Sequence, residues 1–145
     1  MSKDERTGWR DEALSLRHRV WGHDCPAVDV DFLLIEYDYA KPVALIEYKD
    51  SRTAPIIFMH ASYRAINILA RSCQIPFFIV LYSHNNGIAW RFQIIFKNLQ
   101  PIDSPKTMNE MEYVTFLYSL RKRTVPENIM KILSVDHPKS LTDFM

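Results

Sequence analysis

Apolar residues recur at helical spacing in two segments of the chain, from Trp9 to Trp21 and from Ile57 to Cys73. Between them lie two runs that are rich in β-branched and aromatic residues, Val28 to Tyr39 and Val43 to Lys49. The intervening Ala40-Lys41-Pro42 is typical of a turn. The pattern therefore predicts a helix, a β-hairpin and a second helix, in that order.

Two further strands and two further helices are predicted after the second helix. The segment from Pro76 to Tyr82 is almost continuously apolar, as expected for a central strand that is covered on both faces. An Asn-Gly turn separates it from Ile88 to Phe96, where apolar and polar residues alternate. Thr107 and Thr124 are each followed three residues later by a glutamate, which predicts a capping box at the start of two helices.

Each of the first two predicted helices has one apolar side, which we expect to face a sheet. On the first helix this side contains Trp9, Ala13, Leu16 and Val20. On the second helix it contains Ala65, Ile66, Leu69 and Cys73. The order of elements predicts a single mixed α/β domain over residues 1–145, with a central sheet between helices. Its core would span about residues 8–98, followed by C-terminal helices over about 107–135 and a flexible tail at 136–145.

Charged residues interrupt the apolar hairpin at one end, with Asp31 on the first strand and Glu47 and Lys49 on the second. Glu47 and Lys49 share a strand face; an odd number of loop residues puts Asp31 on that face too, and an even number puts it on the opposite face. Two carboxylates on an apolar surface repel unless a divalent cation lies between them, and Mg²⁺ typically takes one or two protein carboxylates. The hairpin therefore predicts a magnesium site, and the alternative is a solvated ion pair on a half-exposed strand.

This arrangement resembles the PD-(D/E)XK phosphodiesterase superfamily, in which an Asp opens one strand and a (D/E)-x-K triplet ends the next. The resemblance extends over the element order from about Arg10 to Phe96. It implies a restriction endonuclease-like core and a DNA endonuclease that depends on Mg²⁺ or Mn²⁺ and leaves 5′-phosphate ends. Asp31 and Glu47 would hold the metal together with the backbone carbonyl of Tyr48. Lys49 would orient or help to deprotonate the attacking water.

The resemblance leaves alternatives at two positions. The Pro-Asp of the family is absent, because Asp31 follows Val30, and Asp29 on the same strand face is an alternative metal-bridging carboxylate. Several family members add a glutamate from the first helix, and Glu12, at the border of the apolar side, is the candidate for that position. Family members of this size often pair, which implies a possible homodimer on DNA.

A polar and basic stripe follows the second predicted helix through His60, Arg64, Asn67 and Arg71. It would either contact nucleic-acid phosphates or be the solvated face of the helix, and Arg17 on the first helix has the same two interpretations. The net charge of +1 neither requires nor excludes a polyanionic partner. The alternative to a nuclease is a nucleic-acid- or protein-binding adaptor that keeps the nuclease fold without its chemistry.

The sequence predicts neither export nor a membrane partner. Cys25 and Cys73 are far apart and suit a reducing cytosol, and the charged N-terminus is not followed by an apolar signal-peptide core. The longest apolar run, Ile75 to Tyr82, has about eight residues, far fewer than the roughly 20 that span a bilayer. We therefore expect a cytoplasmic protein.

Overall fold

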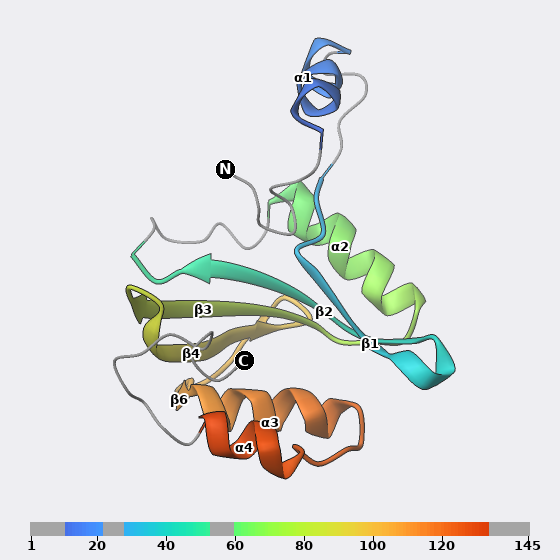
Figure 1. Cartoon of the computed structure of the whole chain (residues 1–145). Helices are drawn as coiled ribbons and strands as arrows, with labels where there is room; N and C mark the ends of the chain where they lie inside the picture. Colours follow the sequence, from blue (N-terminus) through green and yellow to red (C-terminus); the bar gives the residue numbers. More distant parts are fainter. Residues whose placement is uncertain (1–10, 22–27, 53–59, 134–145) are drawn as a thin grey trace.

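The computed structural model describes residues 11–21, 28–52 and 60–133 of the chain. Its elements are α1 (Glu12–Val20), β1 (Phe32–Glu36), the 3-10 turn η2 (Tyr37–Tyr39), β2 (Lys41–Asp50), α2 (Ala61–Ser72), β3 (Phe77–Asn85), β4 (Ile88–Lys97), β5 (Gln100–Pro101), β6 (Thr107–Asn109), α3 (Glu110–Leu120) and α4 (Glu127–Leu133). They form an α/β fold in which a mixed, open sheet lies between helices (Figure 1).

The strands follow the order β1-β2-β3-β4-β5, and β6 pairs separately with β4. Among the strands that the structure describes, only β2 and β3 run parallel to each other, and α2 lies in the crossover between them. Figure 1 shows α2 on one face of the sheet and α3 with α4 on the other. This arrangement makes β2 and β3 the central strands and leaves β1 at an edge of the sheet.

Two hydrophobic clusters fill the spaces above and below the sheet. The cluster on the α3 side contains Ala44, Ile46, Phe78, Val80 and Tyr113. The cluster on the α2 side contains Leu45, Ile66, Ala70, Phe77 and Ile79. Alternate residues of β2 therefore face opposite clusters, as expected for a strand that is covered on both sides. By the same alternation, Glu47 belongs to the α2 face and Tyr48 to the α3 face.

The first predicted helix is present as α1, but described residues do not cover its apolar side. Leu14, Leu16 and Val20 are between about half and 70% exposed, and Figure 1 shows α1 standing off the sheet. The prediction of a buried apolar side is therefore wrong for the part of α1 that the structure describes. Trp9 lies outside the described residues.

The second predicted helix is present as α2, capped by His60, while residues 57–59 lie outside the described part. Its buried residues are Ile66 and Ala70, whereas Leu69 is half exposed and Cys73 is exposed. The predicted apolar side is thus wrong, because the side that packs on the sheet is rotated by part of a turn toward Ala70. The predicted apolar side and the observed one, which contains Ala70, share Ile66. The small side chain of Ala70 suits close approach of α2 to the sheet.

The third predicted helix begins later than expected, because Thr107–Asn109 forms β6 against β4. The helix α3 starts at Glu110, and its capping box uses Asn109 and Glu112. The capping box predicted at Thr107 is therefore wrong by two residues; Thr107, which is β-branched, extends the sheet instead. The last predicted helix is present as α4, but it begins at Glu127, three residues after the Thr124 at which the capping box is predicted.

Candidate metal-binding active site

The β1–β2 hairpin positions the acidic residues, and its turn differs from the predicted one. Glu36 pairs with Lys41, so the loop contains the four residues 37–40 instead of an odd number. A four-residue loop alone would set Asp31 and Glu47 on opposite faces of the hairpin.

A β-bulge in β2 returns Asp31 to the strand face that contains Glu47. Ile35 pairs with Pro42 and Leu34 pairs with Ala44, so β2 contains one residue more than β1 at this point. Proline has no N–H to donate to the strand ladder, and bulges are among the few places in a sheet where it is tolerated. Continued past the bulge to the start of β1, the register brings the two carboxylates to adjacent positions on the α2 face.

Asp31, Glu47 and Lys49 form a compact charged group at this end of the hairpin. The backbone N–H of Tyr48 donates a hydrogen bond to Oδ2 of Asp31 at 3.1 Å, which fixes the carboxylate against β2. The side chains of Asp31 and Glu47 are within hydrogen-bonding reach of each other. The Nζ of Lys49 lies 3.7 Å from Oε2 of Glu47, and the two side chains are 36% and 11% exposed.

The electrostatic environment of Glu47 disfavours its charged form. Burial is the largest cause, and the charge and hydrogen bond of Asp31 add to it; together they raise the pKa of Glu47 from 4.5 to about 7, although Lys49 opposes the rise. At neutral pH, therefore, the Asp31–Glu47 pair holds a proton for part of the time. A divalent cation would also reduce the repulsion between the two adjacent carboxylates, and its binding would displace that proton.

Tyr63 on α2 is a member of the site that the sequence analysis did not single out. Its ring centroid lies 5.8 Å from Nζ of Lys49. Burial lowers the pKa of Lys49, but the Tyr63 hydroxyl and the two carboxylates outweigh it, and the net pKa of Lys49 is raised. The only signal available in the sequence was helical spacing, because Tyr63 is three residues before Ile66 and seven before Ala70, the two buried residues of the helix.

The donor set of this site fits Mg²⁺ better than a soft transition metal. Within the described residues, no group of three or more His, Cys, Asp or Glu side chains is gathered as a metal cage. Two carboxylates with room for water are the protein ligands that Mg²⁺ typically uses. Asp31 and Glu47 would hold the ion.

The other predicted ligands are placed less closely. Asp29 is exposed and precedes β1, and Glu12 is exposed on α1, which stands off the sheet. The structure thus joins Asp31 to Glu47 and does not bring Glu12 to them. The role of the Tyr48 carbonyl as a ligand remains a prediction.

The predicted basic stripe is mostly exposed to solvent. Arg64 and Arg71 are exposed on α2, Asn67 is partly buried, and the ring of His60 caps the helix by accepting from the N–H of Ser62. Arg17 is exposed on α1. Arg64 and Arg71 are therefore the exposed members of the stripe that carry a permanent positive charge.

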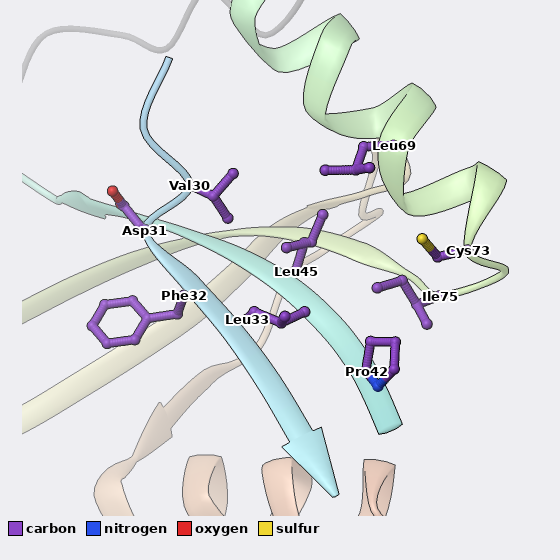
Figure 2. Close-up of a pocket in the computed structure, with 9 residues that line it drawn as sticks. All are labelled: Val30, Asp31, Phe32, Leu33, Pro42, Leu45, Leu69, Cys73 and Ile75. Carbon is purple, nitrogen blue, oxygen red and sulfur yellow. The ribbon is translucent and has the colours of Figure 1, made fainter. Parts of the chain in front are cut away.

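An apolar pocket of about 560 Å³ lies beside the carboxylate pair, between β1 and α2. Figure 2 shows Leu33, Leu45 and Leu69 in this pocket, with the Asp31 carboxylate at its border and directed away from them. Leu69 and Cys73, which were predicted to be buried, line this pocket instead. Asp31 is the one charged residue among those that line the pocket.

Comparisons with protein-family models, with curated proteins and with solved structures give no match to this chain. The family resemblance therefore rests on Asp31, Glu47, Lys49 and the order of the elements around them. None of the helices in the described ranges is long and apolar enough to cross a membrane.

Proposed function

We propose that this protein is a Mg²⁺- or Mn²⁺-dependent nuclease that cleaves DNA phosphodiester bonds and has a restriction endonuclease-like core. The observation that carries this proposal is the Asp31–Glu47 pair, in which a buried carboxylate with a raised pKa lies beside a second carboxylate and a lysine. Such an arrangement is costly for stability and is typical of functional sites.

Asp31 and Glu47 would bind the divalent ion through carboxylate oxygens. When bound, the ion supplies Lewis-acid stabilisation of phosphate charge and lowers the pKa of a coordinated water. Lys49 stays protonated at neutral pH because its pKa is raised, which favours a hydrogen-bond donor over a general base. Its ammonium group would stabilise the charge that develops on a non-bridging phosphate oxygen, and Tyr63 would hold it in position.

The test is a cleavage assay on plasmid, linear and branched DNA and on RNA, with Mg²⁺, Mn²⁺ or EDTA. We expect cleavage by the wild type with metal, and none with EDTA or with Glu47→Ala or Lys49→Ala. Asp103→Asn and Lys97→Ala are matched controls, because both residues are exposed outside the site. Wild type and site variants that cleave equally would refute the proposal.

A wild type that binds DNA but cleaves no substrate would favour the adaptor function instead. Cleavage of RNA or of branched DNA alone would keep the chemistry and change the substrate.

A homodimer would present two such sites to the two strands of DNA. The edge strand β1 supports this arrangement, because Phe32, Leu33 and Ile35 are between 40% and 50% exposed on it. Molar mass from light scattering, compared between the wild type and Leu33→Lys, tests the dimer; a wild type of monomer mass contradicts it.

A further inference from the structure

A second pocket lies at the other end of the β1–β2 hairpin and is strongly basic. It has a volume of about 630 Å³ and is enclosed by the hairpin turn, the segment that precedes β3 and the end of α3. Its charged lining residues are Lys41, Arg121, Lys122 and Arg123 against a single carboxylate, that of Glu36. Because β1 has five residues, this pocket is about 16 Å from Asp31 along the strand.

Arg123 and Glu36 neutralise each other within this pocket. The Arg123 guanidinium donates hydrogen bonds to both oxygens of Glu36, and its Nη2 also reaches Oδ2 of Asp38 at 2.9 Å. These contacts, the hydrogen bond of Arg123 first, lower the pKa of Glu36 and keep it ionised. The four cations Lys41, Arg121, Lys122 and Arg123 thus face the two carboxylates of Glu36 and Asp38, which leaves this region with a net positive charge.

Arg121 has an unsatisfied donor at the wall of the pocket. Its Nε is buried, lies 3.5 Å from Oε1 of Glu36 and makes no hydrogen bond to any described residue. Its guanidinium carbon lies 5.3 Å from the centroid of the Tyr118 ring, which restricts its orientation. Glu36 and Tyr118 thus hold the guanidinium of Arg121 at the wall of the pocket.

Backbone groups at the end of α3 are not available to a ligand. The N–H groups of Arg121, Lys122 and Arg123 donate to carbonyl oxygens of Tyr118 and Ser119. Recognition of an anion must therefore come from the side chains. Guanidinium and ammonium groups that converge in one pocket are the donors that phosphate recognition uses.

We propose that this pocket binds a phosphate-type oxyanion through Arg121, Lys41 and Lys122. The anion is either free phosphate or a phosphodiester group of a nucleic acid, since both offer the same oxygens to these donors. The proposal does not depend on the nuclease chemistry at Asp31 and Glu47. In the second case, the pocket would hold a nucleic-acid strand at a distance from the carboxylate pair.

Titrations of backbone amide NMR signals at constant ionic strength, in EDTA, test this proposal. One arm uses inorganic phosphate, and the other uses a short DNA oligonucleotide without terminal phosphates. The double variant Lys41→Ala/Lys122→Ala removes two pocket charges and leaves the Arg123–Glu36 contact intact. Its control, Lys97→Ala/Lys106→Ala, removes two exposed charges elsewhere.

We expect saturable shifts at Gln74 and Arg121, with affinity reduced at least about tenfold in the pocket variant and unchanged in the control. Saturation by phosphate alone identifies a free-phosphate site, whereas saturation by the oligonucleotide identifies a phosphodiester site. Equal weakening in both double variants, or no saturable shift in either arm, would overturn the proposal. Far-ultraviolet circular dichroism verifies that both variants are folded.

Discussion

Glu47→Gln should stabilise the protein at neutral pH while it removes the proposed activity. Glutamine has nearly the same shape as glutamate, and its amide can still donate a hydrogen bond to Asp31. What the substitution removes is the cost of ionising a buried carboxylate beside another one. A rise of the pKa from 4.5 to about 7 corresponds to about 3 kcal/mol.

The sign of the pH dependence follows from this rise. In the unfolded chain Glu47 ionises near its ordinary pKa of 4.5, and in the folded protein it ionises near 7. Between these values the folded state binds more protons, so its free energy of unfolding falls as the pH rises. The stabilisation that comes from protonated Glu47 is fully present below pH 4.5 and is lost as the pH rises above about 7.

Urea unfolding of the wild type and Glu47→Gln, at several pH values from 4 to 8 in EDTA, measures this effect. The variant should be more stable by up to about 3 kcal/mol at pH 8, or by roughly 10 °C in Tm. The difference should shrink toward zero near pH 4. Acidic groups with lowered pKa values, such as Glu112, affect both proteins alike and cancel in the difference.

Mg²⁺ provides an internal check, because a bound cation relieves the same repulsion. It should stabilise the wild type at pH 8 more than it stabilises the variant, with NaCl of equal ionic strength as the control. A variant that is less stable than the wild type at pH 8, or a difference that does not change with pH, would refute the reasoning about this pair.

Three further substitutions test other parts of the account. Tyr63→Phe removes the hydroxyl that raises the pKa of Lys49, so the basic limb of the cleavage pH profile should move to lower pH; an unchanged profile contradicts a positioning role. Tyr113→Phe breaks the 2.6 Å hydrogen bond with the Tyr48 hydroxyl and should cost about 1–3 kcal/mol in urea unfolding without changing cleavage. Ala70→Leu should lower the free energy of unfolding by about 1–3 kcal/mol, because the larger side chain overpacks the contact between α2 and the sheet. Ala65→Leu, at an exposed position, should leave it nearly unchanged. The reverse order would mean that α2 packs through the side that contains Ala65.

The sequence was sufficient to predict the types and order of the main elements, because apolar periodicity is a local property. It did not determine which side of α2 packs, since the predicted side through Leu69 and the observed side through Ala70 share Ile66, and only the position of the sheet distinguishes them. The start of α3 shows the same limit. Both Thr107 and Asn109 are followed by a glutamate at the right spacing, and pairing of Thr107 with Gln93 on β4 decides between them.

The candidate site depends on a feature that strand periodicity alone misses. Counting loop residues assumed a regular ladder, but a four-residue loop and a β-bulge each shift the register by one, and together they restore the face of Asp31. Pro42 was the one local signal, because a proline in a central strand indicates a bulge.

The contacts between distant segments were beyond sequence reasoning altogether. The ion pair of Arg123 with Glu36 joins residues that are 87 positions apart, and no local pattern connects them. For that reason Arg121, Lys122 and Arg123 could be recognised in the sequence only as a basic cluster near a helix end. All three line the pocket, and the fold distinguishes two of them, since Arg123 is hydrogen-bonded to Glu36 and Asp38 whereas Nε of Arg121 lies 3.5 Å from Glu36 without a hydrogen bond to any described residue.

Cleavage of DNA with Mn²⁺ by Asp31→Asn and by Asp29→Asn distinguishes the two candidate aspartates. The N–H of Tyr48 donates a hydrogen bond to Asp31 and holds it against β2 beside Glu47, and on this ground we propose Asp31 as the metal-bridging carboxylate. We predict that Asp31→Asn abolishes cleavage and that Asp29→Asn retains it. An Asp31→Asn protein that cleaves DNA as fast as the wild type would contradict the account.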